Sequence, residues 1–309
     1  MPAGATTHVE FQPARFRKAA ADDSAERIVT PAVDLAFLPR KGQTIRALSF
    51  PGVSPLPLAG LIPHGFFEDI SHSFDLFCGH VVLVDRSGRQ VTDLEPAAPV
   101  PGGEADEPIR VRRSFRVATA AGDIVKTYWV YRDRPRVDLR LEFRFPSIRP
   151  ISFRVGALTA LPRSFDPAAI RYATANGGTA VETFDLPGRV VAHDAPVTTL
   201  VSATSCVGAT EGWLDFADGD KGIGVIANKA ELFSAFLVHH EPVDDLFYFR
   251  AWATVGENDE TSELVWRGHN ALTLSYVGHG GDLAPVREAA RAIRHPLVAV
   301  RAWRGASAD

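Results

Sequence analysis

The chain has 309 residues, of which 46% are hydrophobic and 23% are charged, and its formal net charge is −4. This composition can supply a substantial core, and the lack of a basic excess argues against nucleic acid as a partner. No stretch approaches the roughly 18 apolar residues of a membrane span. We therefore expect a protein without membrane association, in the cytoplasm.

We expect neither ordered structure at the two ends of the chain nor a disulfide between its cysteines. Residues 1–26 have neither the apolar core of a signal peptide nor a clear period, so we expect a loosely ordered arm there. Residues 27–305 are expected to form one domain, followed by a tail over 306–309. With only Cys78 and Cys206, the favoured interpretation is two buried thiols rather than a disulfide.

The clearest local signal is a period of two between Arg136 and Phe145, where apolar and charged residues alternate strictly. Successive side chains of a strand point to opposite faces, so this segment predicts a strand with one apolar face. Two similar segments precede it, separated by the turn formers Ala121-Gly122-Asp123 and Arg134-Pro135. The range Ile109 to Phe145 therefore predicts a three-stranded antiparallel meander.

Further short strands are predicted along the rest of the chain, and helix is scarce. The predicted strands are Val29–Leu38, Thr44–Phe50, Val81–Asp85, Ile151–Leu161, Ile170–Ala173, Thr198–Cys206, Gly212–Phe216, Gly222–Ala227, Leu232–His239, Leu246–Thr254, Glu263–Trp266, Ala271–Val277 and Leu297–Trp303. The one predicted helix is Leu283–Ile293, with Asp282 as its N-cap. Residues 95–107, rich in Pro, Gly and Ala, are expected to form a surface loop. The fold class predicted is all-β: a large two-sheet antiparallel β-sandwich, or supersandwich, with one short helix near the C-terminus.

Two segments of the second half carry a family resemblance. Residues 212–228 place a Trp-bearing strand before an acidic turn, a Gly-led strand and Asn228, and residues 276–297 place a His/Gly/Asp turn before a helix that ends in His295-Pro296-Leu297. These segments resemble the C-terminal β-domain of glycoside hydrolase family 38, the α-mannosidases. The front half, Pro31 to Asp85, resembles the opening of a galactose-mutarotase-type supersandwich.

This resemblance implies a sugar context without the family's activity. Nothing here corresponds to the catalytic α/β domain that supplies the family's zinc ligands and nucleophile, and the mutarotase pattern of two histidines and a late glutamate is not recognisable. The first hypothesis is therefore a carbohydrate-binding or accessory domain that works either alone or as the partner of a separately encoded glycosidase. The resemblance also makes a homodimer plausible.

The densest polar cluster lies between residues 64 and 75, where histidines and carboxylates alternate with aromatic residues. That mixture suits sugars, because carboxylates accept hydroxyl hydrogen bonds while aromatic faces stack on C–H patches. The ligand-binding candidates are His64, Glu68, Asp69, His72 and Asp75. Glu68, Asp69 and Asp75 are also the catalytic candidates, since glycoside hydrolysis needs two carboxylates across the bond. The alternative is a loop that merely packs its aromatic residues.

A second cluster, His239-His240-Glu241-Pro242, leads into an aromatic segment that contains Trp252. We interpret the histidine pair as a solvated turn, with His240 and Trp252 as additional ligand-binding candidates. Adjacent residues of a strand face opposite ways, so only one of the two histidines can line a given cleft. Trp129 and Trp213 are expected in the core.

No cofactor is predicted. The histidine spacing matches no zinc signature, and Ca²⁺ held by Glu68, Asp69 and Asp75 is a weaker alternative. Two further functions stay open: a self-contained epimerase or glycosidase-like hydrolase that uses the histidines and carboxylates of residues 64–75, and a non-catalytic assembly subunit.

Overall fold

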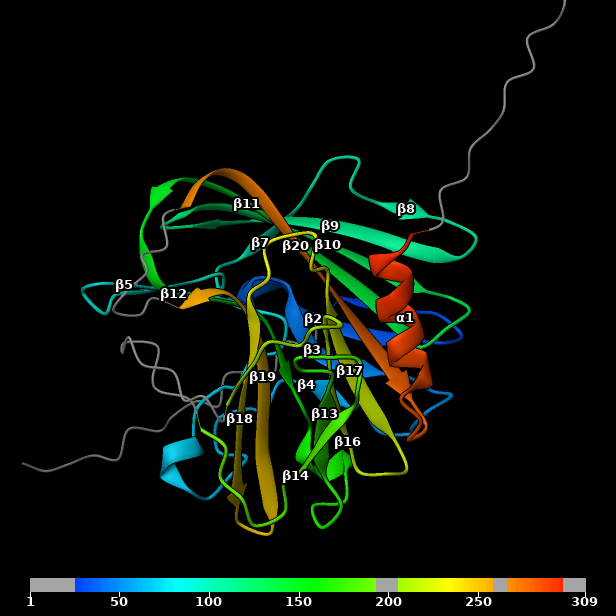
Figure 1. Ribbon diagram of the computed structural model, residues 1–309. Coiled ribbons are helices and arrows are strands. Elements are labelled where there is room, and N and C mark those ends of the chain that lie inside the picture. Colours follow the sequence, from blue (N-terminus) through cyan, green and yellow to red (C-terminus); the bar gives the residue numbers. More distant parts are fainter. Residues whose placement is uncertain (1–25, 193–204, 258–265, 297–309) are drawn as a thin grey trace, which may run out of the picture.

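The computed structural model describes residues 26–192, 205–257 and 266–296. Within these ranges the chain forms twenty strands, three short 3-10 helices and one α-helix, and every strand pairing is antiparallel. The strands form three sheets of ten, six and four strands (Figure 1). No helix in the described ranges is long and apolar enough to cross a membrane.

The ten-stranded sheet has the order β14-β13-β16-β17-β20-β11-β10-β9-β7, and β8 also pairs with β9. Its strands are β7 (Ala97–Pro99), β8 (Ala105–Asp106), β9 (Arg110–Thr119), β10 (Gly122–Tyr131), β11 (Arg136–Ile148), β13 (Arg171–Thr174), β14 (Glu182–Asp185), β16 (Trp213–Ala217), β17 (Gly222–Ala227) and β20 (Trp266–His279). The single helix, α1 (Ala284–Arg294), packs on this sheet, where Val286 and Ala290 are buried against Trp213 and Ile226.

The six-stranded sheet has the order β15-β18-β19-β12-β5-β6. Its strands are β5 (Val81–Asp85), β6 (Gln90–Thr92), β12 (Pro150–Thr159), β15 (Cys206–Val207), β18 (Ala235–Val243) and β19 (Leu246–Glu257). The four-stranded sheet comprises β1 (Arg27–Val29), β2 (Asp34–Leu38), β3 (Thr44–Ser49) and β4 (Ala59–Gly60). The 3-10 helices are η1 (Pro39–Lys41), η2 (Ile70–His72) and η3 (Pro162–Ser164).

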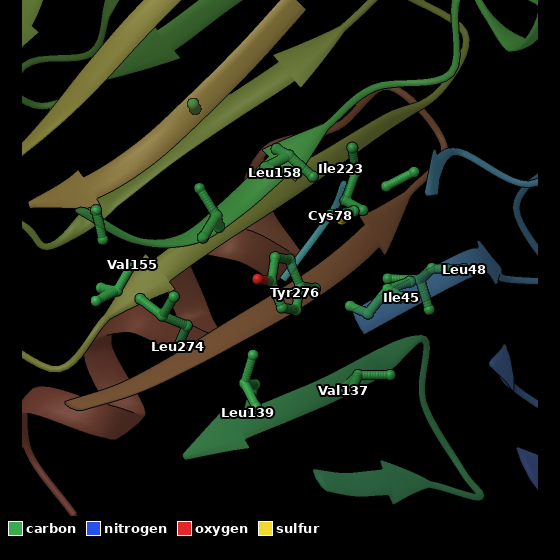
Figure 2. Packing of buried hydrophobic residues seen from close by; sticks show 14 of the residues in the cluster. Ile45, Leu48, Cys78, Val137, Leu139, Val155, Leu158, Ile223, Leu274 and Tyr276 are labelled. Atoms are coloured by element: carbon green, nitrogen blue, oxygen red, sulfur yellow. The ribbon is translucent and has the colours of Figure 1, made fainter. Parts of the chain in front are cut away.

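Side chains of all three sheets meet in one main hydrophobic core. Figure 2 shows members of this core from the three sheets, among them Ile45 of β3, Leu139 of β11, Val155 of β12 and Leu274 of β20. The alternation predicted for β11 is the reason: its apolar residues are buried on the core side, while Arg140 and Arg144 lie on the other side. In the six-stranded sheet, one face contributes residues such as Val155 and Phe249 to this core, while Val82 and Trp252 on the other face belong to a separate small cluster.

The predicted antiparallel β-sandwich with one helix near the C-terminus is confirmed. The prediction of Asp282 as the N-cap was wrong by one residue: Leu283 is at the N-cap, and Asp282 accepts from the N–H of Ala284 at 2.9 Å. Trp213 is buried and Cys78 is a buried free thiol, as expected; Cys206 is free but only partly buried.

Several predictions were wrong. The N-terminal strands form a third sheet rather than part of two, and the expected loop over residues 95–107 contributes β7 and β8 to the edge of the ten-stranded sheet. Trp129 is only partly buried, because it lies on the outer face of β10 with the Arg110 guanidinium over its ring, 5.6 Å from the centroid. The predicted strand Leu297–Trp303 lies outside the described residues, as do Thr198–Cys206 and Glu263–Trp266 except for their last residues, and the N-terminal arm except for Glu26.

Candidate functional site

A cleft of about 530 Å³ lies on the face of the six-stranded sheet that points away from the main core. Its volume is in the range of about 300 to 1,000 Å³ that small-molecule sites occupy. It is lined by Phe74, Asp75, Phe77, His80, Val82, Gln90, Thr92, Leu94, Arg154, His239, Tyr248, Arg250 and Trp252. This cleft combines aromatic rings with buried cations and histidines, and we take it as the candidate site.

Strand alternation in β19 builds the floor of the cleft. Phe247, Phe249 and Ala251 belong to the main core, so Tyr248, Arg250 and Trp252 point to the opposite face. The register places Arg250 between His239 of β18 and Thr159 of β12. Residues from three strands far apart in the sequence are thereby brought side by side.

β12, which borders both the cleft and the main core, contains a backbone irregularity. Gly156 has a φ of 58°, and the pairing of β12 with β19 shifts register between Val155 and Leu158. A Cβ at Gly156 would lie 2.0 Å from Cδ1 of Leu274, so only glycine fits there without a shift. The Gly156 N–H donates to the carbonyl oxygen of His80 at 2.8 Å, which fixes His80 beside β12.

The Arg250 guanidinium is buried beneath the cleft surface; the residue is 7% exposed. Its Nε donates to Thr159 Oγ1 at 3.2 Å, and one terminal nitrogen donates to the Phe77 carbonyl oxygen at 2.9 Å. The guanidinium carbon lies 4.4 Å from the centroid of the Trp252 ring. The charge is thus held by neutral groups and by a cation–π contact.

A second arginine of the cleft, Arg154, has a carboxylate partner. Its Nε and one terminal nitrogen donate to the two oxygens of Glu257, at 2.9 and 3.0 Å. This two-point geometry is the strong form of an arginine–carboxylate pair. Glu257 also accepts from the hydroxyls of Ser152 and Thr254, both at 3.1 Å, so the pair is fixed from both sides of β12.

His80 is a neutral side chain in this environment. Burial is the main cause that lowers its pKa well below the usual value, and the positive charges of Arg250 and Lys126 lower it further. The ring packs edge-on against Trp252, with 4.6 Å between centroids, and Nδ1 lies 3.1 Å from the Phe77 carbonyl oxygen. Neutral imidazole offers a ligand one donor and one acceptor.

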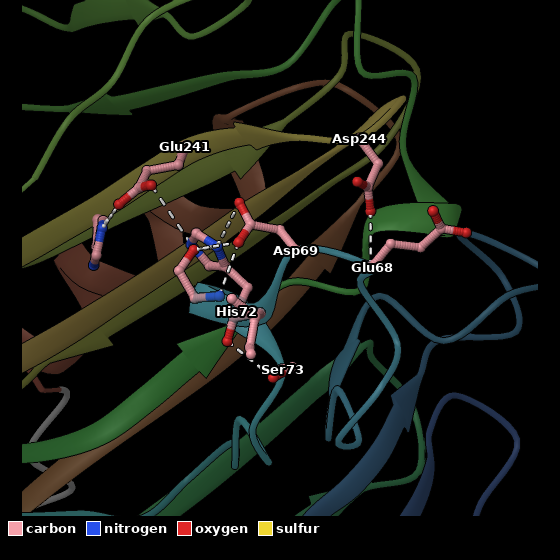
Figure 3. A network of polar contacts seen from close by, with 9 residues as sticks. Glu68, Asp69, His72, Ser73, Glu241 and Asp244 are labelled. Atoms are coloured by element: carbon pink, nitrogen blue, oxygen red, sulfur yellow. Dashed lines mark hydrogen bonds and ion pairs between the residues drawn. The ribbon is translucent and has the colours of Figure 1, made fainter.

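A chain of polar contacts runs from the edge of the molecule to His239 at the cleft (Figure 3). Asp69 accepts from the Ser71 hydroxyl at 2.7 Å, and that oxygen lies 3.0 Å from His72 Nδ1. His72 Nε2 lies 3.5 Å from one oxygen of Glu241, whose other oxygen lies 2.5 Å from His239 Nε2. One carboxylate therefore bridges two imidazoles. Burial lowers the pKa of His239, and Glu241 acts in the opposite direction.

The structure separates the candidates between residues 64 and 75. Only Asp75 lines the cleft, and its Oδ1 accepts from the backbone N–H of His64 at 2.8 Å. His64 is exposed, and its Nδ1 contacts the Ser73 carbonyl oxygen. Glu68 is exposed and its N–H donates to Asp244 at 3.1 Å, while Asp69 caps η2 by accepting from the Ser71 N–H at 2.8 Å. The hydrogen bonds from the Ser71 hydroxyl and the Ser71 N–H lower the pKa of Asp69.

His72 does not line the cleft; it is buried between the Phe67 ring and the cleft residue Tyr248, and it is connected with His239 through Glu241. The placement indicates that much of this segment is an edge loop supporting the cleft.

The interpretation of the His239-His240 pair as a solvated turn was wrong, because both residues lie inside β18. As expected from strand geometry, only one of them lines the cleft, and it is His239 rather than His240. His240 is 1% exposed and its Nδ1 lies 2.8 Å from the Arg189 carbonyl oxygen. Trp252 lines the cleft, and its role in ligand binding stays a prediction.

The sequence-based search overlooked the two arginines of the cleft and His239. The signal was present: Arg154 interrupts the apolar run Ile151–Leu158, and Arg250 stands between Phe249 and Ala251. A charged residue inside a strand that is apolar on both faces points to a buried pair or a ligand contact.

No group of three His, Cys, Asp or Glu side chains that could hold a metal ion occurs in the described part of the chain. Of the carboxylates suggested for Ca²⁺, Asp75 and Asp69 accept from the N–H groups of different residues, His64 and Ser71, and Glu68 is exposed. The cleft offers instead a hydrogen-bonding surface around an indole ring, which suits a small polar ligand.

Comparisons with known proteins extend the description of the fold. Neither a scan against protein-family models nor a search of the curated proteins gives a match. Among solved structures, the Slr1438 protein of Synechocystis sp. PCC 6803 matches with 12% identity and a TM-score of 0.53, over 89% of this chain and 100% of that chain. The α-N-acetylgalactosaminidase NagBb of Bifidobacterium bifidum, in a complex with GalNAc, matches with 12% identity and a TM-score of 0.54.

The match with NagBb covers 86% of this chain but 38% of that chain. A structure from Escherichia coli K12, whose description proposes an aldose 1-epimerase, matches with 9% identity and a TM-score of 0.49, over 83% of this chain and 99% of that chain. The matches with Slr1438 and NagBb show that the large β-sandwich recurs in a whole chain and in part of a glycosidase. The narrower resemblance to family 38 stays a prediction.

Proposed function

We propose that this protein binds a carbohydrate in the cleft on the outer face of the six-stranded sheet. The observation that carries the proposal is the composition of the cleft: an indole ring, Trp252, is surrounded by the polar side chains of His80, Arg154, His239 and Arg250. Sugars present alternating hydroxyl and C–H surfaces, so a site for them needs fixed hydrogen-bonding groups beside an aromatic ring.

The groups around Trp252 are held in place before any ligand arrives. Arg154 is fixed by Glu257, Arg250 by Thr159 and Phe77, and His239 by Glu241. Fixed polar groups lower the entropic cost of binding. The shared fold with part of an α-N-acetylgalactosaminidase is consistent with the proposal, although at 12% identity that likeness concerns the fold alone.

A second candidate function, a sugar-active enzyme, is favoured by the contact between His239 and Glu241. A histidine at a cleft, oriented by a carboxylate on its far nitrogen, is the arrangement of a general acid or base. Proton transfer at a sugar carbon or oxygen, as in an epimerase or a hydrolase, would use His239. In that role Glu241 orients the imidazole, and His72 and Ser71 connect it with the protein edge.

The proposal has two further parts that concern partners. The protein acts either alone or beside a separately encoded glycosidase, and it forms a homodimer. An assembly subunit without a ligand site is the competing hypothesis.

A thermal-shift screen of the purified full-length chain tests the proposal. Monosaccharides and oligosaccharides are added alone, with Ca²⁺ and with Zn²⁺, because a ligand that binds the folded state raises the melting temperature with its concentration. We expect one sugar class to raise it in the wild type and in Trp129→Leu, but not in Trp252→Leu. A flat response to every sugar contradicts the proposal and favours the assembly subunit.

The same ligands separate the two candidate functions. Incubation of each binding sugar with the protein, followed by ¹H NMR of the anomeric region, reveals turnover. Turnover that disappears in His239→Gln while binding persists supports the enzyme. Binding without any change of the sugar supports recognition alone.

A further inference from the structure

We propose that the sugar bound in this cleft carries an anionic group, a carboxylate or a phosphate, which pairs with the Arg250 guanidinium. This inference rests on the proposed carbohydrate-binding function and names the chemical class of its ligand.

Arg250 stands apart from the other buried cations around it. Lys126, which is fully buried below the cleft, lies 2.6 Å from the Asp93 carboxylate, and Arg154 is bound at two points by Glu257. For Arg250, no carboxylate of the described residues comes within ion-pair distance. Its hydrogen-bonding partners include the Thr159 hydroxyl, the Phe77 carbonyl oxygen and, at 3.4 Å, Nδ1 of His80, and all three are neutral.

A buried charge without a counter-charge is costly, because it loses its hydration and gains no Coulombic partner. Proteins normally place a carboxylate beside such an arginine, as this chain does for Arg154. Arg250 nevertheless lines the cleft, so its counter-charge can come from a ligand that enters the cleft. The five N–H donors of a guanidinium match the oxygens of a carboxylate or phosphate.

The carboxylates nearest in the site are engaged elsewhere. Glu241 lies between His239 and His72, and Asp75, exposed at the cleft, accepts from the His64 N–H. The Glu241 carboxylate is the negative partner of His239, so His239 does not require a negative charge on the ligand. Trp252 covers one face of the guanidinium at 4.4 Å, which directs an incoming anion to the edge, where the N–H groups point.

The local potential agrees with an anion site. Arg250 and Lys126 both act to lower the pKa of His80, so their positive charges are felt at the position of its ring. Because Asp93 balances the charge of Lys126, the charge of Arg250 is the one that can attract a negative group on a ligand.

Isothermal titration calorimetry with matched ligands tests this inference on the wild-type, full-length protein. In the gluco, galacto and manno series, the methyl glycoside of each uronate is compared with its uncharged methyl ester, with the parent methyl glycoside and with the hexose 6-phosphate. A charge-assisted contact predicts that an acid binds about tenfold or more tightly than its neutral counterparts. The uronate and phosphate arms identify which anion is preferred.

Two variants of Arg250 localise the effect. Arg250→Gln is expected to remove the preference for the acid while the neutral glycoside still binds, and Arg250→Lys is expected to retain part of it. Arg134→Gln, which removes an exposed guanidinium paired with Asp133, is the control and should change neither affinity.

The outcomes separate the two proposals. Neutral and acidic ligands that bind equally well, or a preference for the neutral ones, overturn the anion inference and leave carbohydrate binding intact. Absence of binding by every ligand overturns both. If Arg250→Gln does not fold, the comparison of each uronate with its methyl ester in the wild type still decides the inference.

Discussion

The Arg250 guanidinium lies over the indole of Trp252, with 4.4 Å between the guanidinium carbon and the ring centroid. The two residues are next-but-one neighbours on β19, so they share the face of the sheet that points away from the main core. The His80 ring packs edge-on against the same indole, with 4.6 Å between the ring centroids. Trp252 therefore supports two polar side chains of the cleft.

Replacing Trp252 should cost stability as well as binding. The residue is 6% exposed and packs with Leu237, Val82 and Ala157 in a small cluster of its own. Trp252→Ala is expected to lower the free energy of unfolding by about 3 to 5 kcal/mol, the usual cost of truncating a buried aromatic residue. Trp252→Phe should cost clearly less. Urea denaturation followed by far-UV circular dichroism measures both, and a Trp252→Ala variant as stable as the wild type would refute this packing role.

Glu241 should control the protonation of His239. Its carboxylate favours the charged imidazole, against the effect of burial, so Glu241→Gln is expected to lower the pKa of His239 further. NMR titration of ¹³C-labelled histidine side chains measures this change. Glu68→Gln, an exposed carboxylate at the edge loop, is the matched control and should leave the pKa of His239 in place. An unchanged His239 pKa in Glu241→Gln would mean that the contact does not persist in solution.

Stability should fall as the pH drops below about 6.5, and His240 is one cause. Burial lowers its folded-state pKa to about 4, while the unfolded chain titrates near 6.5. Between about pH 4 and pH 6.5 the unfolded state binds a proton at His240 that the folded state does not. The contribution of His240 to the free energy of unfolding therefore rises with pH between about 4 and about 6.5 and is constant below that range. His80, whose pKa is also lowered by burial, contributes in the same direction.

Urea denaturation at pH 7 and pH 5 measures this dependence. We expect a smaller loss of stability on acidification in His240→Asn, whose amide can replace the imidazole Nδ1 as a donor to the Arg189 carbonyl oxygen. Equal losses in the wild type and in His240→Asn would show that His240 is not responsible.

The buried pair Lys126–Asp93 should be one of the most sensitive positions of the fold. Both side chains are 0% exposed, Lys126 Nζ also donates to the Gly79 carbonyl oxygen at 3.1 Å, and Asp93 accepts from the Val81 N–H at 2.9 Å. Asp93→Ala leaves a buried ammonium without a partner, for which about 3 to 5 kcal/mol of destabilisation is typical.

A surface pair provides the comparison. Asp133→Ala breaks the exposed pair with Arg134 and should cost at most about 1 kcal/mol. Chemical denaturation of both variants gives the two values. A loss in Asp93→Ala no larger than in Asp133→Ala would show that the charge of Lys126 is compensated by water or by other groups.

Local patterns in the sequence were sufficient for the elements of the fold. The alternation between Arg136 and Phe145 and the segment Leu283–Ile293 correspond to β11 and α1, because a strand or a helix is determined largely by which neighbours along the chain are apolar. The third sheet was missed, since the partner of a strand depends on contacts that the local pattern does not contain.

The candidate site was predicted only in part for the same reason. Asp75 and Trp252 were among the candidates, but the polar density around Glu68 and Asp69 belongs to an edge loop. There the Asp69 side chain caps η2, and the Glu68 backbone N–H donates to the Asp244 carboxylate. Arg250 and Arg154 face the cleft because the register of β12, β18 and β19 places them there. A buried arginine within an apolar strand was the only sign of them in the sequence.

Whether a sugar occupies the cleft at Trp252 can be observed by ¹⁹F NMR of the protein labelled with 5-fluorotryptophan. The chain has five tryptophans, and the Trp252→Phe variant assigns one of the five resonances to Trp252. During titration with a sugar found by the thermal-shift screen, the account predicts a saturable shift of the Trp252 resonance, while that of the core residue Trp213 stays in place. Saturation of the protein with the sugar while the Trp252 resonance does not move would place the binding elsewhere and contradict the account.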